Sequence, residues 1–356
     1  EVQSIGDGSG EISHLWEREC TIQRRNQKLI EIAPSPSLDE ALRARITKAA
    51  LTLARAAGYD SLGTFEFLVD AQADAAGEGA FAFIEANPRL QVEHTVTEEV
   101  LGVDLVRAQI AVAAGAALAQ LGLAQREVPR PAGHAMQLRV NMETMDETGA
   151  THPSGGTLQA FQPPAGPGVR VDTFGYPGYR VSAAFDSLLA KVIVHSRSPR
   201  FEDVVRKAQR ALREFRIGGV ATNIGFLEAL LAHPDLAANR VDTRFIDRSV
   251  AELVRAGGQG RRLYVEAPDD PAVRAEHASG AAARAVHAPT GTAAVTAPLQ
   301  GTVVSVDVEP GRTVRAGEAV AVLEAVKMEH PGCAEQGGLV RGIATQPGGT
   351  LMPREP

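Results

Sequence analysis

Apolar residues recur along the chain with two different periods, and this pattern predicts a mixed α+β fold. Residues 1–33 alternate in short pieces that are typical of strands, and residues 63–69 and 80–85 read as two further strands joined by an Ala/Gly-rich hairpin turn. The chain between them predicts a helix, whose apolar face is formed by Leu38, Leu42, Ile46, Ala49 and Leu53. We expect Ser37 and Glu40 to form a capping box at the start of this helix.

Further helices are predicted from the same helical period. Asp104 is expected to cap a helix that contains Leu105, Val106 and Ile110. Ser198-Pro199 opens another helix, with proline at its first position and an apolar stripe formed by Val204, Val205, Ala208, Leu212 and Phe215. A shorter helix covers residues 224–231, and residues 133–194 have the many Gly/Pro turns of a β-rich segment.

The end of the chain contains an internal repeat. Residues 339–348 repeat the strand and turn of residues 301–311, so that Pro310-Gly311 and Pro347-Gly348 occupy matching places. This symmetry predicts a flattened β-sandwich with Lys327 on the hairpin at its midpoint. The ammonium of Lys327 is then held out to solvent, where it can be modified.

Changes in composition divide the chain into four segments, which we predict to be two α+β domains, a linker and a small β domain. Their boundaries are 1–130, 131–253, 254–293 and 294–356. The linker is rich in Ala, Gly, Arg and Pro, and one short strand is expected in it at residues 263–265. About forty residues of relaxed coil have an end-to-end distance of roughly 35 Å, enough for the last domain to move between two sites.

Composition and charge exclude some classes of function. With 356 residues, a formal net charge of -7 and no basic cluster, the chain is not expected to bind nucleic acid or an anionic membrane. No apolar run reaches the roughly 20 residues that span a bilayer. Its two cysteines, Cys20 and Cys333, lack metal-ligand spacing and lie far apart, which favours a reducing, cytoplasmic location.

A strip of polar residues carries the strongest chemical signal. Glu85, Asn87, Arg89, Gln91 and Glu93 occupy every second position, so an extended chain would place all five on one face. Such a strip would ordinarily be a solvated edge strand. Here two acids and an amide suit a hard cation such as Mg²⁺, which Glu66 on the neighbouring strand could help to bind. Arg89 offers a planar fork to an oxyanion, and Glu93 remains as a base.

This strip resembles the metal and bicarbonate segment of biotin carboxylase, a member of the ATP-grasp superfamily. Residues 19–28, 133–141 and 185–191 support the resemblance, which extends from residue 1 to about 250. The segment from Leu323 to His330 is similar to the Ala-Met-Lys-Met motif of biotin carboxyl carrier domains. The implied fold is the C-terminal half of an ATP-grasp domain, a biotin carboxylase C-terminal domain and an all-β biotinyl/lipoyl-type sandwich.

The resemblance implies carboxylation of biotin carried on Lys327, driven by ATP and bicarbonate, as the first half-reaction of a biotin-dependent acyl-CoA carboxylase. Its implied partners are a carboxyltransferase domain or subunit, a biotin protein ligase and further copies of the full-length protein. Glu93 would be the general base and Arg139 would stabilise the biotin enolate. Bicarbonate would lie against Lys28, Arg89, Gln91 and Val92; Mg²⁺ or Mn²⁺ against Glu66, Glu85 and Asn87; and the nucleotide against Gln23, Asn26, Leu68 and Ile84.

Some positions depart from the family pattern or have a simpler interpretation. Asn26 stands where the family usually has histidine, and Val326 replaces the first methionine of the carrier motif. Leu68 and Ile84 are expected in the core whatever the function. We expect Asp186 and Lys191 to form an internal ion pair and to have no part in the site. A hydrogen-bonding, structural role suits His14, His94 and His134 as well as a catalytic role does.

Alternatives stay open at this point. The family's amino-terminal domain, its glycine-rich lid and the last strand of its carrier fold have no counterpart in these 356 residues, so we expect the chain alone to be inactive. It could then act only as a carrier or docking module, or belong to a pyruvate- or urea-type carboxylase. A lipoyl carrier is disfavoured because Val326 and Met328 flank the lysine. A non-biotin ATP-grasp ligase gives no reason for the last domain. The linker is too short to hold a carboxyltransferase, which favours an acyl-CoA carboxylase α chain or a single-chain carboxylase.

Overall fold

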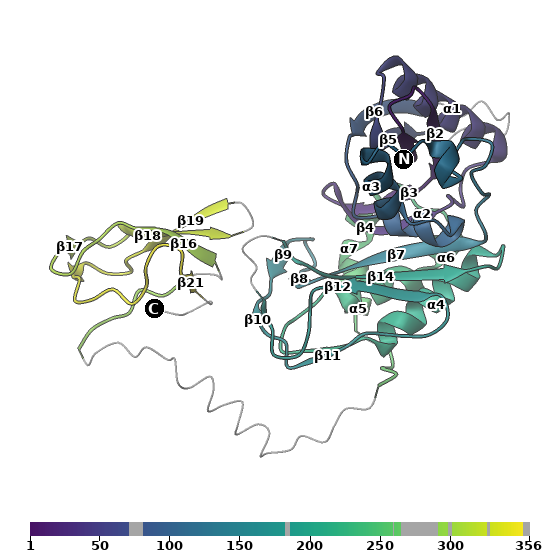
Figure 1. Ribbon diagram of the computed structural model, residues 1–356. Helices are drawn as coiled ribbons and strands as arrows, with labels where there is room; N and C mark the ends of the chain where they lie inside the picture. The colour runs from purple at the N-terminus through teal and green to yellow at the C-terminus, as the bar shows by residue number, and fades with distance from the viewer. Residues whose placement is uncertain are drawn as a thin grey trace.

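The computed structural model describes residues 1–70, 81–181, 186–258, 260–264, 291–297, 301–325 and 328–351. Figure 1 shows two packed α+β layers formed by the first part of the chain and a separate β unit formed by its end. The elements of the first layer are β1 (Val2–Gly6), β2 (Ile12–Glu17), α1 (Glu40–Ala56), β5 (Ser61–Val69), β6 (Phe81–Asn87), α3 (Leu105–Ala113) and the 3-10 helix η1 (Leu118–Leu121).

The first sheet has the strand order β2-β1-β5-β6, and all its pairs are antiparallel. The apolar face of α1 packs on β1 and β2, where Leu42 and Ile46 lie in one buried cluster with Val2, Ile12 and Phe65. The predicted hairpin is confirmed, because β5 pairs with β6 and sets Glu66 directly opposite Glu85. The turn between the two strands lies outside the described residues.

The second sheet has five antiparallel strands, in the order β12-β14-β7-β4-β3. They are β3 (Glu19–Arg24), β4 (Gln27–Ala33), β7 (His134–Asn141), β12 (Val169–Thr173) and β14 (Leu188–Ser196). Because β4 pairs with β7, this sheet joins strands from both sides of residue 130. One face is covered by α2 (His94–Leu101) and the other by α4 (Phe201–Glu214) and α5 (Ile224–Ala232), as Figure 1 shows.

Short elements complete this part of the chain. They are β8 (Glu143–Met145), β9 (Thr151–Pro153), β10 (Gly156–Thr157), β11 (Ala160–Gln162), β13 (Arg180–Val181), β15 (Arg216–Gly218), α6 (Pro234–Ala237) and α7 (Phe245–Ala256). The predicted stripe of α4 is confirmed, since Val204, Val205, Ala208, Leu212 and Phe215 are all buried.

Two helix starts differ from the prediction. The N-cap of α1 is Asp39, which accepts a hydrogen bond from the backbone N–H of Leu42 at 2.7 Å. Ser37 is not the cap, because its hydroxyl donates to Glu19 at 2.5 Å instead. Helix α4 begins after Arg200, so Pro199 precedes the helix rather than opening it. By contrast, Asp104 caps α3 as predicted, and accepts from the N–H of Arg107 at 2.8 Å.

The buried stripe of α1 also differs in part from the prediction. Leu42 and Ile46 are buried, but Ala50, Leu51 and Ala54 continue the stripe. The helical period that starts from Leu42 carries the stripe around the helix and leaves Ala49 and Leu53 at its edge. The strand predicted at residues 263–265 was wrong for its two described residues. Leu263 donates its backbone N–H to Arg213 at the end of α4, at 3.0 Å, and does not join a sheet.

The β unit at the end of the chain contains β16 (Gly301–Val306), β17 (Thr313–Val314), β18 (Ala319–Ala325), β19 (Met328–Cys333), β20 (Gly338–Leu339) and β21 (Thr350–Leu351). Its sheets have the orders β19-β18-β16-β21 and β17-β20. Ala325 at the end of β18 stands opposite Met328 at the start of β19. Val326 and Lys327 lie outside the described residues, so the position of the lysine stays a prediction.

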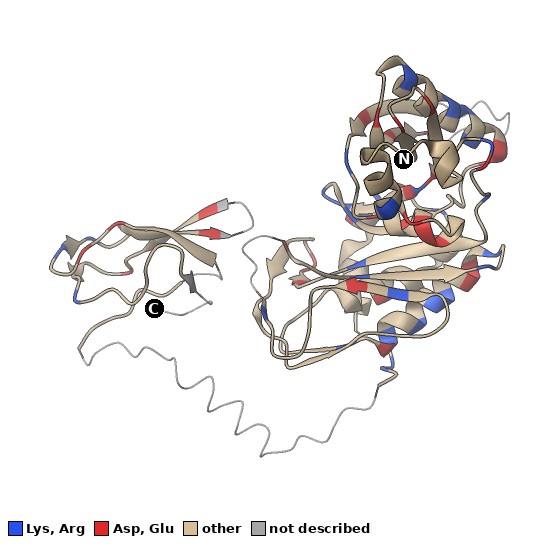
Figure 2. Cartoon of the chain, in the orientation of Figure 1, with Lys and Arg blue, Asp and Glu red and all other residues tan. Residues whose placement is uncertain are grey.

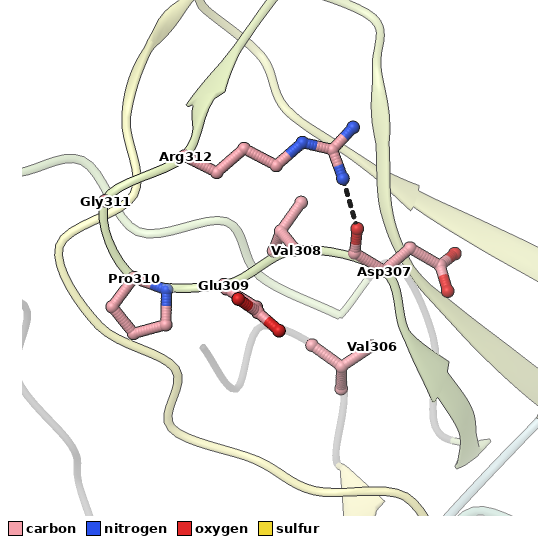
Figure 3. A pocket seen from close by; sticks show the side chains of 7 residues that line it. All are labelled: Val306, Asp307, Val308, Glu309, Pro310, Gly311 and Arg312. Atoms are coloured by element: carbon pink, nitrogen blue, oxygen red, sulfur yellow. Dashed lines mark hydrogen bonds between the residues drawn. The ribbon is translucent and has the colours of Figure 1, made fainter.

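The internal repeat is seen in the two glycine turns of this unit. Gly311 and Gly348 both have positive φ, +92° and +83°, which glycine adopts without strain. At the first turn, Arg312 donates to the backbone oxygen of Asp307 and closes a shallow hollow of about 590 Å³ (Figure 3). The predicted second copy of the strand was wrong, because only Gly338 and Leu339 form strand in that copy.

Candidate active site

A cleft of about 1620 Å³ is lined by residues of both sheets. β5 and β6 contribute acidic side chains from the first sheet, and β3, β4 and β7 contribute side chains from the second. Charged positions of both signs gather where the two sheets meet (Figure 2). The structure brings all the predicted carboxylase site residues to this cleft.

Glu93 lies at the centre of the cleft, with its side chain only 3% exposed. One carboxylate oxygen accepts from the ammonium of Lys28 at 2.7 Å, and the other accepts from the guanidinium of Arg139 at 3.0 Å. Lys28 comes from β4, Arg139 from β7 and Glu93 from the start of α2, so tertiary packing alone brings them together. A carboxylate held between two cations is fixed in orientation and can accept a proton from a bound acid.

Lys28 is surrounded by carboxylates. Besides Glu93, its ammonium contacts Glu1 at 2.6 Å and Glu66 at 3.0 Å. Burial alone would lower the pKa of Lys28, but the negative charge of Glu1 and Glu93 raises it above its ordinary value. Lys28 therefore stays a cation, suited to holding an anion and unsuited to acting as a base.

Arg139 is held from behind by Glu31. The Nε of Arg139 donates to Glu31 at 2.6 Å, and Gln137 donates to the second oxygen of the same carboxylate at 2.9 Å. Burial and the charge of Glu93 raise the pKa of Glu31 to about 7, against the opposing effect of Arg139. Glu31 thus fixes the orientation of Arg139 from behind. On the cleft side, Arg139 contacts a second carboxylate, that of Glu93.

Arg18 organises the floor of the cleft, although its side chain is fully buried. Its Nε donates to Glu1 at 2.6 Å, and its two terminal nitrogens donate to Gln3, Thr97, Thr64 and Gln91. Burial opposes ionisation, but Glu1 and Glu93 raise the pKa of Arg18. One guanidinium therefore joins the first sheet, α2 and the predicted bicarbonate residue Gln91.

The predicted metal ligands lie together on β5 and β6. Asn87 donates to Glu85 at 2.9 Å and to Glu66 at 3.2 Å, so the two carboxylates and the amide are within reach of one ion. Oxygen donors of this kind suit Mg²⁺, which prefers carboxylates and phosphate oxygens. The residues present fit the predicted ion.

The polar strip has the predicted residues in a different conformation. Only Glu85 and Asn87 belong to β6, and the chain turns from Pro88 onwards until α2 begins at His94. Pro88 has no N–H for a strand ladder and ends the extended segment. The prediction of one continuous strand was therefore wrong, because Glu93 enters the site from the first turn of a helix.

The turn places Arg89 and Gln91, two of the four predicted anion ligands, in different surroundings. Gln91 is buried and donates to Glu66 at 3.0 Å. Arg89 is exposed at the cleft, and within the described part of the chain its side chain donates one hydrogen bond, to the backbone oxygen of Leu90 at 3.3 Å. The guanidinium of Arg89 faces the cleft and makes no ion pair with a described carboxylate, so it is well placed to bind an anion.

The predicted nucleotide residues line the same cleft. Leu68 and Ile84 are 55% and 50% exposed, so the expectation that both are core residues was wrong. They lie on the sheet face away from α1, and an apolar surface of this kind suits an aromatic base. Asn26 shares a two-residue turn between β3 and β4 with Arg25, and both have positive φ. Asparagine tolerates that conformation better than most residues, which explains its place here.

Lys191 does not pair with Asp186, which was the predicted partner. Its ammonium contacts Asp172 at 3.2 Å and the backbone oxygen of Val92 at 3.1 Å. The Nδ1 atom of His94 forms a hydrogen bond with the backbone oxygen of Gln91, at 2.7 Å, which supports a structural role for this histidine. Burial lowers the pKa of His94, so the neutral ring is favoured.

Sequence reasoning missed Glu1, Arg18 and Glu31. Arg18 lies in the charged run Glu17-Arg18-Glu19, which is typical of solvated chain, and no local pattern marks it as buried. Glu31 had a usable signal, since an acid between Ile30 and Ile32 in an apolar strand is rarely buried without a partner.

Three family models match the chain. The ATP-binding domain of the carbamoyl-phosphate synthase L chain matches residues 1–121, the biotin carboxylase C-terminal domain matches residues 137–248, and a domain of biotin-requiring enzymes matches residues 293–354. In the described part of the chain, no helix is long and apolar enough to cross a membrane.

Two curated relatives show how far the similarity extends. The chain is 38% identical to the biotin-dependent acyl-coenzyme A carboxylase alpha3 subunit of Mycobacterium leprae, over 98% of this chain and 62% of the relative. It is 47% identical to human mitochondrial pyruvate carboxylase, over 70% of this chain and 20% of the relative. The chain thus spans less than two thirds of the length of either relative.

A solved structure matches the carboxylase part. The biotin carboxylase domain of Hydrogenobacter thermophilus 2-oxoglutarate carboxylase, a dimer in complex with MgADP, ADP and bicarbonate, is 37% identical with a TM-score of 0.64. The match covers 74% of this chain and 53% of that one.

Proposed function

The chain belongs to the biotin-dependent carboxylases, and we propose that it carries the biotin carboxylase site and the biotin carrier of such an enzyme. The reaction is the ATP- and bicarbonate-dependent carboxylation of biotin attached to Lys327. Phosphorylation of bicarbonate releases ADP and gives carboxyphosphate, which breaks down to CO₂ and phosphate. The released phosphate takes the N1 proton of biotin, and the N1 nitrogen then bonds to the carbon of CO₂.

The predicted bicarbonate and biotin residues of the cleft have the following roles. Lys28, Arg89, Gln91 and the backbone of Val92 hold bicarbonate. Glu93 removes the bicarbonate proton, because its carboxylate is buried beside the cation that would hold the anion. Arg139 faces Glu93 and stabilises the negative charge that develops on the biotin ureido oxygen.

The nucleotide and its metal lie at the other end of the cleft. Gln23, Asn26, Leu68 and Ile84 contact the nucleotide, and Glu66, Glu85 and Asn87 hold Mg²⁺ against its phosphates. The bound ion neutralises phosphate charge during transfer. The Hydrogenobacter structure, which contains MgADP and bicarbonate, supports this assignment of ligands.

The acceptor of the carboxyl group is proposed to be an acyl-CoA. The acyl-CoA carboxylase subunit aligns over 98% of this chain, carrier unit included, whereas pyruvate carboxylase aligns over 70%. This difference favours an order in which the carrier follows the carboxylase directly. A carboxyltransferase, a biotin protein ligase and a second copy of the full-length protein are the partners of this function, and the cytoplasm is its proposed location.

The observation that carries the proposal is the buried carboxylate of Glu93 held between Lys28 and Arg139. Its test is bicarbonate-dependent ATP hydrolysis by the full-length gene product, with Glu93→Gln as the variant and the exposed Glu11→Gln as the matched control. We expect E93Q to lose at least about a hundredfold in kcat and E11Q to keep full activity. Equal activity in both variants would contradict the assignment of the base.

The carrier is tested separately by intact-mass measurement after coexpression with a biotin protein ligase. The wild-type chain should gain one biotinyl group, and Lys327→Arg should gain none. An unmodified wild-type chain would refute the carrier role while leaving the carboxylase site untouched.

A further inference from the structure

Three neighbouring strands of the second sheet place a row of charges beneath the cleft. Asp172 on β12 stands directly opposite Lys191 on β14, which stands directly opposite Arg139 on β7. Side chains that are direct partners across antiparallel strands lie on the same face of the sheet. Lys191 is therefore the immediate neighbour of the arginine that faces Glu93.

Lys191 reaches out of this row to the polar turn. Its ammonium donates to the backbone oxygen of Val92 at 3.1 Å, and Asp172 fixes its position from the other side at 3.2 Å. The lysine side chain is only 13% exposed. Asp172 is held in turn by Arg170, at 2.8 Å, and Arg170 contacts Glu98 of α2 at 2.7 Å. The lysine is thus a fixed connection between the sheet and the turn.

The backbone oxygen that Lys191 contacts belongs to the peptide bond between Val92 and Glu93. The oxygen of Val92 and the N–H of Glu93 are parts of the same planar unit, so fixing one fixes the other. Glu93 is the N-cap of α2, and its side chain makes no capping hydrogen bond because it points into the cleft. The start of α2 therefore lacks the usual side-chain lock and depends on contacts from elsewhere.

We propose that Lys191 is a positioning residue of the bicarbonate site. It holds the peptide between Val92 and Glu93, so that the Glu93 carboxylate keeps its orientation toward the cleft. The inference rests on the proposed function, because it adds a residue to the same site. Neither Lys191 nor Asp172 lines the cleft, so the effect of Lys191 on the bound anion is indirect.

The chain offers a matched control for this role. Lys207 on α4 also donates to backbone oxygens, those of His195 at 2.6 Å and Pro167 at 3.1 Å. It lies outside the cleft, so Lys207→Met removes an equivalent backbone anchor without touching the site. Lys191→Gln keeps a donor without the charge, and Lys191→Arg keeps both.

The first experiment measures bicarbonate-dependent ATP hydrolysis by the full-length protein. We expect K191M to raise the KM for bicarbonate about tenfold or more and to lower kcat, because small displacements of reacting groups have large kinetic effects. The KM for ATP should change less than twofold. K191R should recover most of the loss, K191Q should recover part of it, and K207M should match wild type. An unchanged KM in K191M, or an equal change in K207M, would overturn the proposal.

The second experiment does not depend on activity. Amide hydrogen exchange of the 356-residue chain reports on the peptides around residues 92–94 directly. K191M should speed exchange there at least tenfold, and K207M should not. Absence of ATP hydrolysis in wild type would refute the proposed function alone, since faster exchange in K191M would still support the anchor. Unchanged exchange in K191M would refute the anchor whatever the activity.

Discussion

The buried guanidinium of Arg18 gives the sharpest test of how this cleft is held together. Arg18→Met keeps most of the side-chain volume but removes the hydrogen bonds to Glu1, Gln3, Thr97, Thr64 and Gln91. The carboxylate of Glu1, only 2% exposed, then keeps its contact with the ammonium of Lys28 at 2.6 Å. Burial would raise the pKa of Glu1, and the nearby cations lower it below its ordinary value.

The size of the loss follows from burial. Breaking a buried ion pair by removing one partner costs about 3–5 kcal/mol, because the remaining charge is left without compensation. Lys28 continues to compensate Glu1, so we expect the lower end, about 3 kcal/mol. Since the pKa of Glu1 is lowered in the folded state, its ionised form stabilises the fold above pH 4.5 and this contribution disappears as pH falls. The cost of R18M should therefore shrink in acid.

Urea unfolding monitored by tryptophan fluorescence measures this loss. Trp16 is the chain's single tryptophan and lies two residues from Arg18, so its signal reports on the same part of the fold. The control is Arg248→Met, which also breaks a contact to a carboxylate, that of Asp242 at 3.0 Å, but in a pair whose side chains are 56% and 42% exposed. Exposed pairs of this kind contribute below about 1 kcal/mol. A loss in R18M no larger than in R248M would refute the argument from burial.

Further expectations concern pH, metal coupling and the start of the linker. Burial lowers the pKa of His14, so its protonation opposes folding and stability should fall as pH drops below 6.5; His14→Gln should flatten that part of the urea-midpoint profile. MgADP should tighten bicarbonate binding severalfold in calorimetry, and Glu66→Gln should abolish the coupling. Glu228, whose side chain is 7% exposed, forms an ion pair with Arg262 at 2.7 Å. Glu228→Ala should therefore speed tryptic cleavage after Arg262 severalfold. Asp203→Asn, which removes a carboxylate from an exposed pair, should leave the cleavage rate unchanged.

Local sequence patterns were enough for several of the elements and for the residues that line the cleft. The strands around Glu66 and Glu85, the stripe of α4 and the polar strip were all recognisable, because each depends on residues close together in the chain. The conformation of the strip could not be recognised from the sequence. Its alternation of polar residues fits a continuous strand and also fits a turn that precedes a helix. Pro88 was the signal that could have decided between them.

The remaining contacts depend on strand register, which local patterns do not contain. Lys191 reaches Val92 because β14 pairs with β7, and Arg18 reaches Gln91 because the first sheet packs against α2. These pairs are separated by 99 and 73 residues. The exposure of Leu68 and Ile84 has the same origin, since only the packed fold shows which face of the hairpin α1 covers.

One carboxylate oxygen connects the proposed metal and bicarbonate ends of the cleft. The Oε1 atom of Glu66 accepts from Lys28 at 3.0 Å, from Gln91 at 3.0 Å and from Asn87 at 3.2 Å. An oxygen has two lone pairs, so it cannot keep these three donors and also coordinate a cation. If a metal ion took the Oε1 atom, Lys28 and Gln91 would lose this acceptor and would be free to donate to a bicarbonate oxygen. Because binding free energies are reciprocal, an anion that draws these two donors away must favour the metal on Glu66 to the same extent. Loss of the coupling in the Glu66→Gln variant, with both ligands still bound separately, would locate it in this carboxylate.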